Sequence, residues 1–178
     1  MALTQVLTGG IKADAVDNTI LKLDDNFAFT GTVTGTNGKL LQAVNAVTTT
    51  ATSTITASGQ HSVLTANITP SSSSSKIFIT AQASCQVVSS SNAIIASDIY
   101  RGDVSSGTQI SRNYDGPTGT SNSVDHYWTA HHAVVDSPST TSEITYTFSI
   151  GRGSGGTTSI KTVGSAAHPV VMSVMEIG

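Results

Sequence analysis

Charged side chains are scarce in this sequence of 178 residues: 8 are Lys or Arg, 11 are Asp or Glu, and the formal net charge is −3. Binding to a nucleic acid backbone requires clustered lysine and arginine, and the sequence contains no such cluster. We therefore expect no nucleic acid partner. So few ionic side chains also produce little self-repulsion, which favours a protein that lives in an assembly.

Cysteine and long apolar runs are scarce as well. Cys85 is the one cysteine, so an intrachain disulfide is excluded. The first residues, MALTQVLTGG, lack the basic and apolar regions of a secretory signal, and no apolar run approaches the length that spans a membrane. We expect a soluble chain that is made in the cytosol and does not insert into a membrane.

Hydroxyl side chains are abundant, since serine and threonine make up about three in ten residues. Residues 61–88 predict two strands joined by a turn, because Pro70 and the serines 71–75 interrupt an alternating pattern. The predicted apolar faces are Ser62, Leu64, Ala66 and Ile68 in the first strand, and Ile77, Ile79, Ala81, Ala83, Cys85 and Val87 in the second. We predict a hairpin around which the rest of the chain folds.

Seven further stretches predict strands: 39–50, 93–101, 109–112, 124–135, 143–150, 157–163 and 169–177. In residues 143–150, the apolar face is Ile144, Tyr146, Phe148 and Ile150. Turn-forming segments lie at 113–123 and 151–156, and no amphipathic helix is present. The sequence therefore predicts an all-β fold, an antiparallel and jelly-roll-like β-sandwich, but it leaves the strand order open.

The last predicted strand, PVVMSVMEI, is apolar on both faces. A strand of this kind is covered on both sides. It lies either in the centre of the sandwich or at a subunit interface. The second alternative assigns Val170, Met172 and Val174 to a trimer contact.

Residues 1–36 differ from the rest, and we predict an extended attachment and stem segment there, with the sandwich head at 37–178. Residues 26–36, NFAFTGTVTGT, alternate apolar and small polar side chains. One such strand cannot bury its apolar face alone, but several copies side by side could, which favours a multi-chain stem or a docking strand. The predicted attachment residues are Leu3, Val6, Leu7, Ile11, Ile20 and Leu21.

Several stretches resemble a family of viral proteins. The head contains ITPSSSSSKIFI, IYRGD, VVDSPSTTSEITYTFSI and VVMSVMEI, and the leader reads GGIKADAVDNTILKLDDNFAFTGTVTG. They resemble the C-terminal heads and N-terminal attachment segments of marine bacteriophage (cyanophage-like) fibre and appendage proteins. The resemblance implies a homotrimeric virion appendage that is assembled in the bacterial host cytoplasm and anchored to another virion protein, of the tail or the capsid, through residues 1–36.

Three functions are compatible with these features. The first is adsorption to a host-surface glycan or protein, as a tail fibre or capsid fibre with an outward head. The second is a capsid decoration or knob with mainly an assembly or loose-attachment role. The third is a carbohydrate-binding module with the same sandwich. We predict no enzymatic activity, because the sequence has no nucleophile elbow, no HExxH motif and no phosphate-binding loop.

The best candidates for recognition lie between residues 111 and 128. Aromatic rings stack on the apolar faces of sugars, and carboxylate and amide groups bind hydroxyls. The alternative is an ordinary turn-rich loop followed by core aromatic residues. The candidates are Arg112, Tyr114, Asp115, Asn122, Asp125, Tyr127 and Trp128.

Three short patterns have structural explanations. Arg101-Gly102-Asp103 suits a strand end followed by a tight turn. Gly151-x-Gly153-x-x-Gly156 precedes a predicted strand, not the helix that a dinucleotide site needs. The histidines suit polar strand or interface positions, so we predict no metal site and no cofactor. One alternative is a metal on a threefold axis with one histidine from each copy; the candidates are His126, His131, His132 and His168.

Overall fold

The computed structural model describes residues 39–178, apart from 53–54, 57–58, 90–92, 115–123 and 156–157. The predicted attachment residues from Leu3 to Leu21 lie outside the described residues, and the division of the chain after residue 36 stays a prediction. The described strands are β1 Leu40–Thr48, β2 Gly59–Ile68, β3 Lys76–Ser89, β4 Ala93–Arg101, β5 Thr108–Tyr114, β6 Val124–Asp136, β7 Ile144–Gly155, β8 Thr158–Thr162 and β9 Val170–Ile177.

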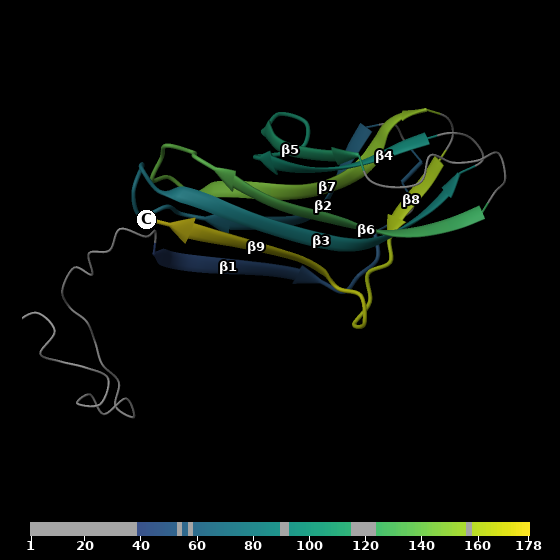
Figure 1. Cartoon of the computed structure of the whole chain (residues 1–178), viewed down its shortest axis with the longest axis horizontal. Coiled ribbons are helices and arrows are strands. Elements are labelled where there is room, and N and C mark those ends of the chain that lie inside the picture. Colours follow the sequence, from purple (N-terminus) through teal and green to yellow (C-terminus); the bar gives the residue numbers. More distant parts are fainter. Residues whose placement is uncertain (1–38, 53–54, 57–58, 90–92, 115–123, 156–157) are drawn as a thin grey trace, which may run out of the picture. The chain divides into compact units, whose positions relative to one another are not determined.

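The strands form two antiparallel sheets that pack face to face (Figure 1). Sheet A has the order β1-β9-β3-β6, with β8 also paired to β3, and sheet B has the order β2-β7-β4-β5. The first described strand thus pairs with the last, which is the connectivity of a jelly roll. The predicted all-β, jelly-roll-like sandwich is confirmed, and the structure supplies the strand order.

The predicted hairpin at residues 61–88 is wrong, because β2 and β3 lie in different sheets. β2 pairs with β7, whereas β3 lies between β6 and β9. The segment from Thr69 to Ser75 therefore crosses from sheet B to sheet A. Two strands with one apolar face each can bury those faces side by side in one sheet or facing each other across a sandwich. The period of two is the same in both arrangements.

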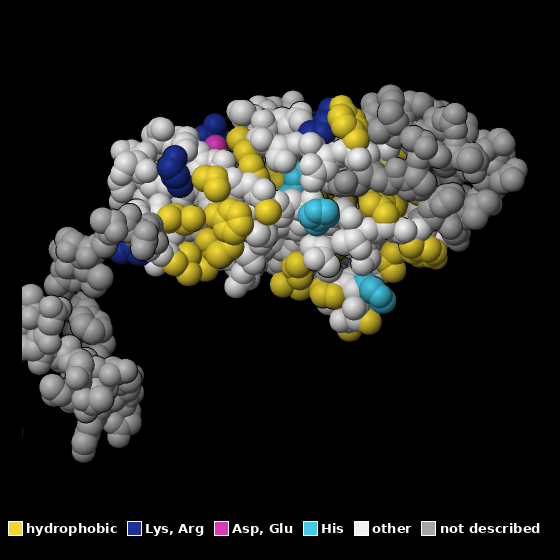
Figure 2. All heavy atoms as spheres, viewed as in Figure 1, with side chains coloured by type: hydrophobic (Ala, Val, Ile, Leu, Met, Phe, Trp, Pro, Cys, Tyr) yellow, Lys and Arg dark blue, Asp and Glu magenta, His cyan; other side chains and the backbone are white. Residues whose placement is uncertain are grey.

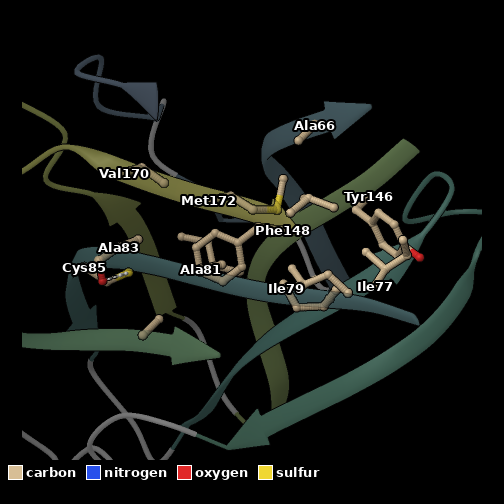
Figure 3. Close-up of a cluster of buried hydrophobic side chains, with 14 of the residues drawn as sticks. Ala66, Ile77, Ile79, Ala81, Ala83, Cys85, Tyr146, Phe148, Val170 and Met172 are labelled. Atoms are coloured by element: carbon tan, nitrogen blue, oxygen red, sulfur yellow. Dashed lines mark hydrogen bonds between the residues drawn. The ribbon is translucent and has the colours of Figure 1, made fainter. Parts of the chain in front are cut away.

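The core lies between the sheets and is built from alternate residues of each strand. The six apolar residues predicted for the inner face of β3 are at most 4% exposed. Figure 3 shows Tyr146 and Phe148 reaching from β7 toward Ile77 and Ile79 of β3, with Met172 of β9 nearby. The predicted apolar face of residues 143–150 is likewise buried. These two predicted faces are confirmed.

β2 contains a β-bulge that reverses its alternation. Its register with β7 shifts between Ser62 and Leu64, so Val63 is the extra residue. Leu64 pairs with inward-facing Phe148, but Ser62 is exposed, and His61 takes the inner side before the bulge. The prediction that Ser62 shares a face with Leu64 is therefore wrong, because one inserted residue moves every preceding side chain to the opposite face.

β9 occupies the central position, between β1 and β3. Val170, Met172 and Val174 face the core and are at most 1% exposed. They leave no surface for a second copy, so the assignment of these three residues to a trimer contact is corrected. The outer face of β9 is partly exposed and consists of Val171, Ser173, Met175 and Ile177.

The glycine-rich stretch after residue 150 continues β7 and does not form the predicted turn, since the strand extends to Gly155. Gly151 pairs with Gln60, and a Cβ at Gly151 would collide with the carbonyl oxygen of Gly59. Close approach of two backbones therefore requires glycine at this position. A strand in place of a turn and helix also supports the prediction that this stretch is no dinucleotide site.

Candidate functional site

The predicted recognition residues do not form one site. Arg112 and Tyr114 lie on β5 in sheet B, whereas Tyr127 and Trp128 lie on β6 in sheet A. Two further candidates, Asp115 and Asn122, lie outside the described residues. Of Asp125, the structure describes the backbone, which pairs with that of Val88, but not the side chain.

Arg112 is held by a buried carboxylate. Its Nε and one terminal nitrogen donate hydrogen bonds of 2.8 and 2.7 Å to the two oxygens of Asp98, which is fully buried. The hydroxyl of Tyr100 donates a further hydrogen bond of 3.2 Å to Asp98. The hydrogen bonds to Asp98 raise the pKa of Arg112, so the guanidinium stays charged. Arg112 is thus committed to a contact within its own chain.

A pocket of about 380 Å³ lies on the outer face of sheet A. Its floor is a row of three neighbouring residues: Thr129 on β6, Ser84 on β3, and Val163, whose N–H donates a 2.8 Å hydrogen bond to the carbonyl of Ser84. Tyr127 lies two residues before Thr129 on the same face, and His168 lines the pocket from the β8–β9 connection.

The pocket exists because β8 and β9 pair with the same edge of β3, one after the other. β9 pairs as far as Gln82, and β8 begins at Cys85. The connection between them leaves the sheet and projects below it in the view of Figure 1. Two backbone hydrogen bonds between Ser165 and His168, of 3.2 and 3.0 Å, fix the turn that carries His168.

Tyr127 and Trp128 point to opposite sides of β6, as adjacent strand residues must. Tyr127 is 66% exposed and lines the pocket with its ring on the outer face. Trp128 pairs with the fully buried Cys85 and packs against the core cluster. Its indole N–H is buried without a hydrogen-bond partner among the described residues. Trp128 therefore supports the pocket from beneath.

A second hollow continues the pocket along β3. It has a volume of about 280 Å³, and its outer-face residues include Thr80, Gln82, His131 and Val171. Gln82 pairs with His131 on one side and with Val171 on the other. Figure 2 shows histidine side chains on this face of the molecule. The two hollows give sheet A an outer face lined by hydroxyl, amide, imidazole and aromatic groups.

An apolar band crosses the other end of the same face. The register places Ala43, Met175, Phe78 and Val135 side by side across β1, β9, β3 and β6. Val135 is 50% exposed, and the adjoining Leu40 is 61% exposed. Figure 2 shows hydrophobic side chains gathered over these strand ends. Continuous exposed apolar surface of this kind marks interaction sites.

Buried His132 connects the two sheets. Its Nε2 lies 2.9 Å from the hydroxyl of Ser97 on β4, and its Nδ1 lies 3.1 Å from that of Ser111 on β5. A serine beside a histidine is also the arrangement of a nucleophile and its base. Ser97, which would be the nucleophile, is only 1% exposed, however, and His132, which borders the second hollow, is only 4% exposed. The pair is a polar contact within the core.

Of the other candidate histidines, His131 lines the second hollow and His168 lines the first. His131 and His168 are exposed, and the side chain of His126 lies outside the described residues. No group of three potential metal ligands occurs within the described part of one chain. A site shared between copies on a threefold axis stays a prediction.

The Arg101-Gly102-Asp103 string is a strand end and a turn. Arg101 closes β4 and lies 3.5 Å from the carboxylate of Asp136. Gly102 has φ of 92°, a left-handed conformation that favours glycine, and the carbonyl of Asp103 accepts a 2.6 Å hydrogen bond from Gly107. The structural explanation of this string is confirmed.

Sequence reasoning missed the buried carboxylates. Asp98, Asp136 and Glu176 are each at most 8% exposed. The hydroxyl of Tyr146 donates a 2.7 Å hydrogen bond to Asp136, and burial, followed by this bond, raises the pKa of Tyr146. An acidic residue inside an otherwise apolar strand, as in VVMSVMEI, was the available signal, because a buried charge requires a partner.

Among the described residues, no helix is long and apolar enough to cross a membrane. No family model and no curated protein matches the sequence. Solved structures of infectious bursal disease virus show a distant likeness: the VP2 subviral particle has 11% identity and a TM-score of 0.39, and virus-derived T=1 particles have 11% and 0.41. Each match covers 86% of this chain but only 43% and 42% of the viral chains. A likeness this distant supports no conclusion about function.

Proposed function

We propose that this chain is a structural protein of a bacterial virus particle. In this proposal it forms a homotrimeric appendage, residues 1–36 dock on a tail or capsid protein, and the sandwich points outward to adsorb to the host surface. The sequence resemblance to phage appendage proteins supports the virion assignment. The apolar band on the outer face of sheet A is the structural observation that supports assembly.

The band is costly for a chain that stays alone in water. Exposed apolar surface is unfavourable by about 25 cal/mol per Å² relative to buried surface. Of the outer-face side chains of sheet A that the structure describes, Lys76 and Lys161 are charged and none is acidic. Covering a face with so few charged groups by a second chain therefore costs little free energy of desolvation. We therefore place the contact between copies at the band, with Phe78, Met175 and Val135 at its centre.

The test combines solution mass with imaging. Sedimentation equilibrium of the full chain should give three copies, and electron microscopy of the intact particle should show where residues 1–36 attach. A chain lacking residues 1–36 should remain folded but should no longer decorate particles. A full chain that stays monomeric at micromolar concentration, or a truncated chain that still decorates particles, would contradict the proposal.

A capsid decoration or knob is the alternative within the same class. Imaging would then place the protein on the capsid, and particles that lack the protein should adsorb to the host as well as complete particles do. A carbohydrate-binding module is the alternative of another class, supported by the pocket beside Tyr127. It predicts sugar binding by a chain that never joins a particle. We propose no enzymatic activity, because the hydroxyl of Ser97 beside His132 is buried and that of Ser111, at the other ring nitrogen, is partly buried.

A further inference from the structure

We infer that the pocket between Tyr127 and His168 binds a saccharide that carries an acidic group. This inference rests on the proposed role in adsorption and gives that role a site and a ligand class. Of the recognition residues predicted between 111 and 128 it keeps Tyr127, and it adds Ser84, Thr129 and His168 as further lining residues.

The aromatic side of the pocket is suited to a sugar ring. Aromatic residues make up only 5% of this chain, and Tyr127 is one of the few with its side chain on the surface, being 66% exposed. Its backbone is fixed in β6 by pairing with Gln86 of β3. An exposed tyrosine on a rigid strand offers a flat apolar surface, at low entropic cost, on which the C–H face of a sugar can stack.

The polar side of the pocket is suited to hydroxyl groups. Ser84 and Thr129 provide two hydroxyls on neighbouring strands, and His168 adds an imidazole from the opposite side. Hydroxyls and imidazole both donate and accept hydrogen bonds, which matches the mixed character of sugar hydroxyls. The volume of about 380 Å³ lies at the lower end of the range for ligand pockets, so one sugar unit fits better than a long chain.

A positive charge stands at one end of this arrangement. Gln86 pairs with Tyr127 on one side and with Lys161 of β8 on the other, so the three residues form a row across the outer face. Two strand spacings separate Tyr127 from Lys161, about 10 Å. This row lies next to the floor row of Thr129, Ser84 and Val163. A carboxylate on a ring stacked against Tyr127 is therefore within reach of the lysine side chain.

The charged side chains near the pocket favour an anionic ligand. No acidic residue is among the described residues that line the pocket, and Lys161 has no salt bridge within the same part of the chain. Among the described side chains an anion therefore meets a positive charge there, and a basic peptide would find no counter-charge. A single lysine is too little for a nucleic acid, whose binding depends on several phosphate contacts.

The experiment uses the full chain on a glycan array that pairs acidic glycans, terminated by uronic, sialic or 2-keto-3-deoxy sugar acids, with neutral counterparts. The best hit is then titrated by calorimetry. We expect acidic glycans to bind and their neutral partners to bind more weakly. Tyr127→Ala should weaken binding about tenfold or more, and Lys161→Gln should remove the preference for the acidic member. Tyr114→Ala is the matched control, because Tyr114 is also 66% exposed but lies on sheet B, and it should leave binding unchanged.

Three results would overturn the inference: no acidic glycan bound, equal binding of acidic and neutral partners, or equal loss in Tyr127→Ala and Tyr114→Ala. Attachment to particles is measured on the same variants. Chains that assemble on particles but ignore acidic glycans would refute the pocket and leave the virion role standing. Chains that bind acidic glycans but join no particle would refute the virion role and leave the pocket standing.

Discussion

Glu176 accepts two hydrogen bonds from Ser71, one from its backbone N–H at 2.7 Å and one from its hydroxyl at 2.6 Å. The side-chain amide of Gln42 donates a third, also at 2.6 Å. The fully buried carboxylate thereby joins β9, β1 and the segment that crosses between the sheets. Burial by itself would raise the pKa of Glu176, but the hydrogen bonds from Ser71 and Gln42 outweigh it and lower the pKa to about 2.

Replacing Glu176 by glutamine should destabilise the sandwich. The glutamine amide group is a donor, and at least one of the donors from Ser71 and Gln42 would lose its acceptor. We expect the free energy of unfolding to fall by about 1–3 kcal/mol, measured by urea denaturation at pH 7. Glu143→Gln, at an exposed position, is the control and should change it by less than about 0.5 kcal/mol. Equal stability of the two variants would contradict this role of Glu176.

The same carboxylate makes stability depend on pH at the acidic end. Its folded pKa of about 2 lies below the ordinary value of 4.5, so the unfolded chain binds the proton more tightly. The contribution of the ionised carboxylate to the free energy of unfolding is complete above pH 4.5 and is lost as the pH falls toward 2. The stability difference between the native chain and Glu176→Gln should therefore be constant from pH 5 to 7 and shrink below pH 4.5. A difference that grows as the pH falls would refute the assignment.

Replacing Arg112 alone should destabilise sheet B more than replacing both members of the Arg112–Asp98 ion pair. Arg112→Ala leaves the fully buried Asp98 without its cation, and we expect a loss of about 3 kcal/mol. The double variant Asp98→Asn/Arg112→Gln leaves no charge unpaired and should lose less. Urea denaturation of the three chains measures both values. A larger loss in the double variant would show that the charge on Asp98 is not the cause.

A carboxylate in the core should prevent folding. Ile79 is fully buried between the sheets, and an unpaired charge there costs several kcal/mol against a total stability of about 5–15 kcal/mol. We expect Ile79→Asp to lose the cooperative thermal transition in circular dichroism. Gln82→Asp adds the same charge to the exposed side of the same strand and should keep the transition. A folded Ile79→Asp chain would contradict the inward direction of this face.

Periodicity predicted the strands and their buried faces because pleating alone fixes which side chains share a side. It placed β4 at Ala93–Arg101, as observed, and it predicted the inner face of β3. It could not assign β2 and β3 to different sheets, since pairing depends on partners far away in the sequence. The bulge at Val63 also escaped it, because one inserted residue carries no signal of its own.

The candidate site was only partly predictable for the same reason. The residue type of Tyr127 predicts a recognition role, but its neighbours in the pocket come from elsewhere in the chain, Ser84 from β3 and His168 from the β8–β9 connection. The residue type of Arg112 predicts a ligand contact, but its partner, Asp98, lies on another strand, and the sequence does not show this pairing. Residue type predicts what a side chain can bind, whereas topology decides what already binds it.

A negative charge in the apolar band should reduce self-association without unfolding the head. Val135 is 50% exposed beside Phe78, so aspartate at this position remains hydrated in a single chain but would be buried in the proposed contact between copies. We expect Val135→Asp to weaken association at least tenfold in sedimentation equilibrium, while its thermal transition stays close to that of the native chain. Thr65→Asp adds the same charge to an exposed position of sheet B and should leave association unchanged. Unaltered association of Val135→Asp would exclude the band as the surface between copies and would leave residues 1–36 as the segment that holds them together.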